Sequence, residues 1–382
     1  MNDFVFQTVA DIRFANGALT SIPNLLQDKF ASKSVLIVTD QGLCKLGLID
    51  KLIKLLEEAD ITVSLFNSVT ADPPEEVILA AAQAAQDIDL VIGIGGGSSM
   101  DAAKLAAVLA MNEQPLNAMF GVDMVKSSRK PLVLIPTTAG TGSEVTPISI
   151  VTTGQSTKAG VVSACLYPDV AVLDPSLLLG LPAHITAETG IDAMVHAIEA
   201  YTSKIKKNPL SDNLATKALS LLAKHLPGAY RDGKDIQHRG GTMLGAMLAG
   251  QAFANAPVGA VHALAYPLGG IYHLAHGLTN ALMLPHVLRF NLDHTYQEYA
   301  ELADVLLPKC SGTAEAKAQR FVDYMCEFQE GLGLPKGLRE VGIAESDLMH
   351  LAEQAMLQTR LLQNNPKVLT LQDAHNIYQQ AW

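Results

Sequence analysis

Short apolar runs alternate with amphipathic helical patterns through roughly the first half of the chain. Each run is apolar at consecutive positions rather than at every second one, so both faces of each expected strand must be covered. Strands that alternate with helices are typical of parallel sheets. The pattern therefore predicts a doubly wound, Rossmann-like α/β domain. The expected strands are Val35–Thr39, Thr62–Phe66, Leu90–Ile94, Leu132–Ile135 and Val170–Leu173.

The second half of the chain has a different pattern. Strand signals fade after about residue 180 and long helical patterns dominate, which predicts an all-helical domain. A chain of 382 residues is also too long for one ordinary hydrophobic core. We therefore expect an α/β domain at 1–179 and a helical domain at 180–382, with a ligand site in the cleft between them. Before the boundary, Ile148–Thr152 and Ala159–Ser163 flank a polar turn and predict a hairpin added to the sheet.

Charge and cysteine content limit the expected partners and compartment. The chain has 38 acidic and 27 basic residues, a formal net charge of −11. Such a surface repels nucleic acid and anionic lipid, so neither is an expected partner. The four cysteines include no C-x-x-C pair, which favours reduced thiols. We find no signal-peptide pattern and no apolar run of 18 residues, so we expect a cytosolic protein without a membrane span.

Three consecutive glycines follow the expected strand Leu90–Ile94. Gly95, Gly96 and Gly97 lead into Ser98, which opens a helical pattern. Glycines let the backbone approach a ligand, and the free amides at a helix start attract phosphate. The spacing is not G-x-G-x-x-G, because Ser98 stands where the third glycine would be. A phosphate-binding turn and a tight turn without a ligand are both compatible with this segment.

A second polar segment, P-T-T-A-G-T-G-S-E at 136–144, follows the expected strand Leu132–Ile135. Its hydroxyl and amide groups suit the oxygens of sugars and phosphates. A plain polar loop would have a similar composition. Ligands, however, bind at the carboxyl ends of parallel strands, and two such segments at strand ends of one sheet favour a nucleotide site.

Acidic and imidazole side chains occur in otherwise apolar helical segments. Asp192 and His196 are four residues apart and share one helix face. His262, His273 and His276 lie in a segment without Lys, Arg, Asp or Glu. A buried Asp–His hydrogen bond would explain the first pair, and metal binding is the alternative. Asp192, His196, His262 and His276 could supply one oxygen and three nitrogens, a set that fits Fe(II) or Zn(II).

The sequence resembles the iron-containing (group III) alcohol dehydrogenases over nearly its whole length. Six motifs occur in order: V-T-D at 38–40, G-G-G-S at 95–98, P-T-T-A-G-T-G-S-E at 136–144, P-D-V-A-V-L-D-P at 168–175, G-I-D-A-M-V-H-A-I-E-A-Y at 190–201 and the two-histidine segment from Gly259. The resemblance implies a dinucleotide-binding α/β domain, an all-helical metal domain and a homodimer. It also implies transfer of a hydride between NAD and a small primary alcohol or aldehyde, whose oxygen is held by the metal.

The resemblance assigns roles to individual positions. Asp192, His196, His262 and His276 match the metal ligands, usually of Fe(II), with Zn(II) as the alternative. The expected NAD contacts are Asp40 at the adenosine ribose, the turn formed by Gly95, Gly96, Gly97 and Ser98, the threonine-rich loop with Thr137, Thr138 and Ser143, and Lys158 on the hairpin. A carboxylate at Asp40 would repel the 2′-phosphate of NADP, so we expect a preference for NAD.

One position departs from the family pattern. Many members carry a histidine four residues after the first histidine of the two-histidine segment, and this chain has Tyr266 there. A tyrosine is a poor base at neutral pH. We therefore expect Tyr266 to shape the pocket and to order substrate or water, with proton release through water or His273. The alternative is that Tyr266 only fills space.

Two other enzyme classes share this two-domain plan, namely zinc polyol dehydrogenases of the glycerol dehydrogenase type and dehydroquinate-synthase-like lyases. The H-A-I-E sequence at 196–199 and the complete threonine-rich loop favour the iron-containing family. A non-catalytic protein that keeps metal and nucleotide for stability is the third alternative. The presence of all four expected ligands and of the phosphate turn argues against it.

Overall fold

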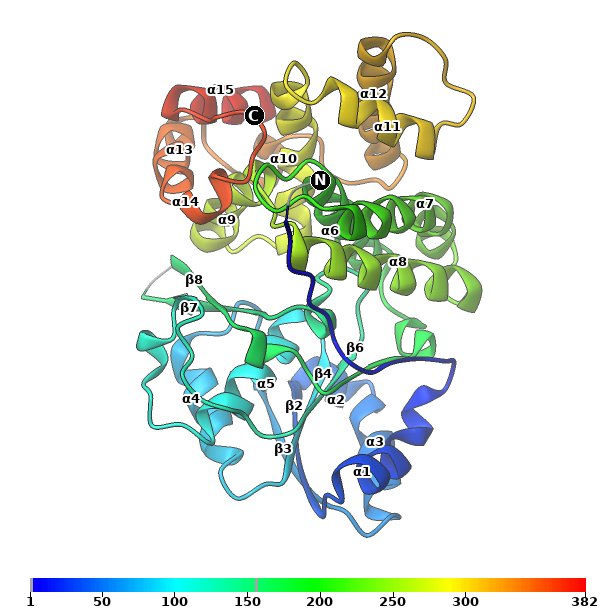
Figure 1. Ribbon diagram of the computed structural model, residues 1–382, viewed down its shortest axis with the longest axis vertical. Coiled ribbons are helices and arrows are strands. Elements are labelled where there is room, and N and C mark those ends of the chain that lie inside the picture. Colours follow the sequence, from blue (N-terminus) through cyan, green and yellow to red (C-terminus); the bar gives the residue numbers. More distant parts are fainter. Residues whose placement is uncertain (1–2, 155–156) are drawn as a thin grey trace. The chain divides into compact units, whose positions relative to one another are not determined.

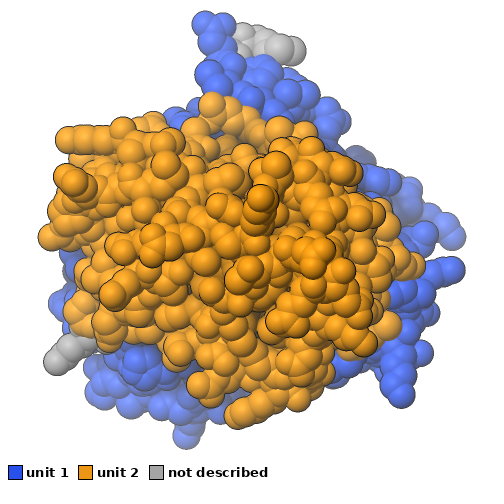
Figure 2. All heavy atoms as spheres, turned by 90° about the horizontal axis from the view of Figure 1, so that it is seen from below, with its two compact units in different colours: residues 1–6, 180–382 blue, residues 7–179 orange. Residues whose placement is uncertain are grey.

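The computed structural model describes residues 3–154 and 157–382 and contains two compact units. Residues 7–179, orange in Figure 2 and called unit 2 in its key, form what we call the first unit, because it comes first in the chain. Residues 180–382, blue and called unit 1 in the key, form the second unit. Residues 3–6 belong to the second unit, whereas the sequence placed them in the first. The reason is that pairing in the sheet of the first unit begins only at Ile12.

The first unit is built on a six-stranded parallel sheet in the order β1-β9-β6-β4-β2-β3 (Figure 1). This confirms the predicted α/β fold. The first strand was not predicted, because its sequence, Ile-Arg-Phe, contains no apolar run. The strands are β1 (Ile12–Phe14), β2 (Ser34–Asp40), β3 (Thr62–Val69), β4 (Leu90–Gly95), β6 (Leu132–Pro136) and β9 (Val170–Leu173).

Helices cover both faces of this sheet. Figure 1 shows α1 and α3 on one face and α4 and α5 on the other. The central strands β4 and β6 are buried at every residue, which is what their uninterrupted apolar sequences predict. The helices are α1 (Ile22–Phe30), α2 (Gln41–Lys45), α3 (Leu48–Glu57), α4 (Glu75–Ala84) and α5 (Gly97–Leu109).

The strand order reverses between β2 and β4. The chain passes from β2 outward to β3, and then returns across β2 to β4 and continues to β6. In an open parallel sheet, such a reversal leaves a crevice at the carboxyl ends of the two strands that flank it. Those ends are Asp40 and Gly95, so the expected ribose contact and phosphate turn follow neighbouring strands.

The predicted hairpin forms, but it does not extend the main sheet. β7 (Ile148–Thr153) pairs antiparallel with β8 (Thr157–Val162), and β8 pairs on its other side with β5 (Gly121–Val122) in a separate three-stranded sheet. The edge of the main sheet beside β9 is occupied by β1, which the sequence did not reveal. The turn residues 155–156 of the predicted hairpin lie outside the described residues.

The described part of the second unit is helical, as predicted. α6 is buried over most of its length and packs against α7, α8 and α10, which explains why it is apolar nearly all round. The helices are α6 (Ala183–Tyr201), α7 (Pro209–Arg231), α8 (Ile236–Asn255), α9 (Ala260–Tyr272), α10 (His276–Asn291), α11 (Tyr296–Leu306), α12 (Ala314–Glu330), α13 (Leu348–Met356), α14 (Thr359–Leu362) and α15 (Leu371–Ala381).

No single helix in the described ranges is long and apolar enough to cross a membrane. Only α8 and α9 taken as a pair meet that test, and they are bent by 106° at the break between them.

Candidate functional site

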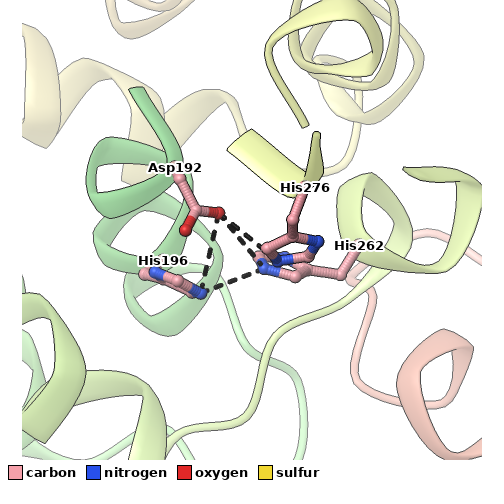
Figure 3. A group of neighbouring side chains, drawn as sticks. All are labelled: Asp192, His196, His262 and His276. Atoms are coloured by element: carbon pink, nitrogen blue, oxygen red, sulfur yellow. Dashed lines mark hydrogen bonds and ion pairs between the residues drawn. The ribbon is translucent and has the colours of Figure 1, made fainter. Parts of the chain in front are cut away.

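Three helices of the second unit bring four metal-binding side chains together (Figure 3). Asp192 and His196 lie one turn apart on α6, His262 lies in the first turn of α9, and His276 is the first residue of α10. One donor atom from each residue lies within 4.8 Å of the donor atoms of the other three. The four residues named from the sequence therefore form one cluster.

The spacing of the donor atoms suits a divalent metal ion. The Nε2 atoms of His196 and His262 are 3.0 Å apart. Asp192 Oδ1 lies 3.9 Å from each of these nitrogens and 3.6 Å from Nε2 of His276. Ligands of a tetrahedral ion with bonds of about 2.1 Å are separated by about 3.4 Å. Three imidazoles and one carboxylate at this spacing fit Fe(II) or Zn(II).

Three of the four side chains in the cluster are buried, and the fourth is partly exposed. The side chains of Asp192, His196 and His262 are at most 5% exposed, whereas 37% of His276 is exposed. Burial opposes ionisation of Asp192, but the three imidazoles and the hydrogen bond from Asn280 outweigh it and hold its pKa below the usual value. The cluster thus combines a charged carboxylate with three imidazoles, and it is accessible at His276. A metal site that is accessible in this way is typical of catalytic rather than closed structural sites.

Three further residues hold the cluster and were missed in the sequence. Phe253 on α8 stacks on His196, with ring centroids 4.3 Å apart. The fully buried Asn280, one turn after His276, donates to Asp192 Oδ1 at 2.6 Å. Glu199, one turn after His196, hydrogen-bonds His262 Nδ1 at 2.6 Å. Asn280 stands four positions after the proposed ligand His276, and this helical spacing was the available signal for it; the three-residue spacing of Glu199 from His196 was a weaker one.

The two residues considered for proton transfer differ in position. Tyr266 on α9 lies beside His276, the partly exposed member of the cluster, with ring centroids 6.1 Å apart. His273 ends α9 with a φ of +56°, is exposed, and has no hydrogen bond or ion pair to any described residue. A left-handed residue directly after a helix is a common helix-terminating feature. The structure thus brings Tyr266, but not His273, into contact with the cluster.

The glycine triplet of the first unit forms the turn from β4 into α5. Gly95 has a φ of +151°, which favours glycine, and a Cβ at Gly97 would lie 2.9 Å from the Thr141 side chain. A Cβ at Gly96 would meet nothing closer than the Thr138 side chain at 3.7 Å. The backbone is therefore tightly packed on one side and open at Gly96, next to the N-terminus of α5, where a phosphate could bind.

The remaining residues expected to bind the cofactor surround this turn to different degrees. Thr137 hydrogen-bonds Gly95 O through its amide, and Thr138 lies beside Gly96. Asp40 caps α2 by accepting from the amide of Leu43 at 3.1 Å. Lys158 pairs with Asp72, whose amide donates to Ser98 Oγ. All of these contacts lie within the first unit.

Ser143 is engaged inside the threonine-rich loop. Its hydroxyl accepts from the fully buried Lys104 at 2.8 Å and donates to Asp101 at 2.6 Å. Burial lowers the pKa of Lys104. Burial also raises the pKa of Glu144, which follows Ser143 in the chain, to about 7. Asp101, Lys104 and Glu144 were not singled out in the sequence, although a lysine and a carboxylate in the apolar α5 were a possible signal. This network ties α5 to the loop that follows β6.

A doubly wound α/β unit with a phosphate-type turn and a helical unit with a histidine–carboxylate cluster are together typical of metal-dependent, nicotinamide-linked oxidoreductases. Two family models match the chain. Residues 10–175 match the model described as iron-containing alcohol dehydrogenase, and residues 186–382 match the C-terminal model of the Fe-containing alcohol dehydrogenase family. The chain belongs to the iron-containing alcohol dehydrogenase family.

Similar proteins cover nearly the whole chain. Long-chain-alcohol dehydrogenase 1 of Geobacillus thermodenitrificans is 41% identical over 93% of this chain and 91% of its own length. NAD-dependent methanol dehydrogenase of Bacillus methanolicus is 35% identical over 96% of each chain. The crystal structure of a 1,3-propanediol oxidoreductase superposes with a TM-score of 0.96, at 34% identity and full coverage of both chains. These likenesses confirm the expected family, fold and reaction class.

Proposed function

We propose that this protein is an NAD-linked alcohol dehydrogenase that uses Fe(II), with Zn(II) as the alternative, and acts on small primary alcohols and the corresponding aldehydes. The observation that carries the proposal is the four-residue cluster of Asp192, His196, His262 and His276, formed in a chain whose relatives are alcohol dehydrogenases. The NAD preference is supported by the name of the Bacillus methanolicus relative and by Asp40 at the reversal of strand order.

The residues in and around the cluster would have different roles in the reaction. Bound there, a divalent ion would supply Lewis-acid chemistry toward the substrate oxygen, while NAD would exchange the hydride. Asp192 offsets half of the charge of the ion. Phe253 shields His196 from water, and the exposed edge of His276 leaves room for a small substrate beside Tyr266. The glycine turn and the threonine-rich loop of the first unit would hold the cofactor.

The test combines metal exchange with an activity screen. The protein is purified without oxygen, stripped with a chelator and reloaded separately with Fe(II) and with Zn(II). Reduction of NAD and NADP is then measured with primary alcohols of increasing chain length and with diols. We expect activity only in a metal-loaded form, with NAD preferred. If neither loaded form reduces either cofactor with any alcohol, the proposal is wrong.

Homodimer formation and a cytosolic location are further parts of the proposal. The dimer is implied by the resemblance to the family, and the location is expected from cysteines without a disulfide pattern. A dimer of two 40.6 kDa chains is readily distinguished from the monomer by light scattering during size-exclusion chromatography. A monomeric mass across the concentration range of the activity assays would contradict the dimer without affecting the proposed reaction.

A further inference from the structure

Glu199 on α6 makes two hydrogen bonds at the start of α9. Its Oε2 lies 2.6 Å from Nδ1 of His262, and its Oε1 accepts from the backbone N–H of Val261 at 2.7 Å. Its side chain is only 6% exposed. A buried carboxylate thus contacts His262 on the side opposite to Nε2, the atom that faces Asp192 and His196.

This contact determines which ring nitrogen of His262 carries the proton. The N–H of Val261 can only donate, so it occupies one carboxylate oxygen in every state. If Glu199 is ionised, Nδ1 of His262 donates to the other oxygen, and Nε2 keeps a free lone pair. If Glu199 were protonated and donated to Nδ1, the proton of the neutral ring would be on Nε2, which could not bind a metal. Only the ionised form is compatible with a ligand role for His262.

The charge of Glu199 also suits the site. Asp192 and Glu199 together carry two negative charges, which is the number that neutralises a buried divalent cation. A buried ion needs such compensation because burial removes its solvation by water. An amide in place of the carboxylate would supply neither the negative charge nor both hydrogen-bond acceptors. It is neutral, and its NH₂ group would face either the N–H of Val261 or the N–H of His262, so two donors would point at each other.

We propose that Glu199 is a positioning residue for the metal site: it holds His262 in the Nδ1–H form and supplies the second negative charge that balances a divalent ion. The inference rests on the proposed function, since it concerns the same cluster. It predicts that removing the carboxylate weakens metal binding although Glu199 itself is no ligand. Residues in this position typically change metal affinity ten- to hundredfold.

The first test measures Zn(II) affinity by chelator competition on stripped protein. Glu199→Gln should bind Zn(II) ten to a hundred times more weakly than the natural protein. The matched control is Glu301→Gln, because Glu301 also accepts a hydrogen bond, from the hydroxyl of Tyr201 at 2.6 Å, yet contacts none of the four cluster residues. It should leave the affinity unchanged. Equal affinities of Glu199→Gln and the natural protein would overturn the proposal.

The second test needs no variant, so it holds even if Glu199→Gln does not fold. Nitrogen-15 NMR of histidine-labelled natural protein, metal-free and Zn(II)-loaded, reports the tautomer of each ring. We expect His262 to carry its proton on Nδ1 in both states, in a slowly exchanging resonance close to the amide of Val261. A proton on Nε2 would overturn the proposal. Natural protein that binds no Zn(II) and reduces no NAD would instead refute the proposed function, whichever tautomer is found.

Discussion

At the scale of single residues, His276 is the exposed member of the metal cluster. Its side chain is 37% exposed, while those of the other three are almost completely buried. His276→Ala therefore removes one of four donors with little loss of packing. We expect metal retention to weaken at least tenfold, measured by metal analysis after dialysis against a chelator. His350→Ala, at an exposed histidine of α13, is the control. Full metal content and activity in His276→Ala would contradict the ligand assignment.

Tyr266 lies beside His276, where its hydroxyl can order substrate or water. Because tyrosine is a weak base at neutral pH, we expect Tyr266→Phe to lose less than about tenfold in kcat/KM across the pH range. Loss of a true general acid or base typically costs a hundredfold or more. His273→Gly provides the comparison, since glycine accepts the positive φ at that position. A loss above a hundredfold in Tyr266→Phe alone would make the tyrosine hydroxyl the proton-transfer group.

Asp40 has one observed role, as the cap of α2, and one proposed role, at the ribose of the cofactor, and one substitution tests both. Its carboxylate caps α2, and it lies where the strand order reverses. Asp40→Gly should allow partial use of NADP, because the charge that repels the 2′-phosphate is gone. Stability should fall by only a few tenths of a kcal/mol, since glycine is an acceptable N-cap. The measurements are kcat/KM with both cofactors and a urea titration. Equal efficiency with NAD and NADP in the natural protein would contradict this role.

At the scale of elements, two glycines in the turn into α5 should respond differently to substitution, one through packing and the other through binding of the cofactor. A Cβ at Gly97 would meet Thr141 at 2.9 Å, whereas a Cβ at Gly96 would make only ordinary van der Waals contact with the Thr138 side chain, at 3.7 Å. We expect Gly97→Ala to lower stability by roughly 1–3 kcal/mol, as overpacking does. Gly96→Ala should leave stability nearly unchanged but weaken NAD binding, because the methyl group would occupy the space expected for phosphate. Thermal unfolding and NAD titration distinguish the two. Unchanged NAD affinity in Gly96→Ala would argue against a pyrophosphate site there.

At the scale of the whole molecule, two buried groups, His286 in the second unit and Glu144 in the first, should change the free energy of unfolding in opposite directions with pH. Burial, assisted by the charge of Arg289, lowers the pKa of His286 in the second unit to about 4. Unfolded histidine has a pKa near 6.5, so the unfolded state binds more protons between these values. The free energy of unfolding therefore falls as pH drops from 6.5 to 4. In the first unit, burial raises the pKa of Glu144 from 4.5 to about 7, which favours the folded state as pH falls through that range.

Two substitutions test this opposition. Relative to the natural protein, His286→Gln should gain stability as pH falls from 6.5 to 4, by at most about 1.4 kcal/mol per pH unit. Glu144→Gln should gain relative stability as pH rises from 4.5 to 7. The measurement is the free energy of urea unfolding across pH, followed separately for the two units. Parallel pH profiles of a variant and the natural protein would contradict the assigned pKa shift for that residue.

The sequence by itself determined the class of fold and the chemical types in the candidate sites. Uninterrupted apolar runs predict buried parallel strands, because covering both faces of a strand requires apolar residues at consecutive positions. The four-residue spacing of Asp192 and His196 predicts a shared helix face for the same local reason. β1 escaped prediction because Ile-Arg-Phe carries no such pattern. The choice of His262 and His276 came from their apolar surroundings and the family resemblance, not from any local geometry.

Only the tertiary structure decided which of these residues meet. His196 and His262 are 66 positions apart, and their contact depends on how α6 packs beside the start of α9. The same packing places Glu199 behind His262 and leaves His273 exposed at a helix end. The hairpin likewise pairs with β5 in a separate sheet, while β1 occupies the edge of the main sheet beside β9. Periodicity and propensity act over a few residues, whereas these contacts depend on the packing of elements far apart in the chain.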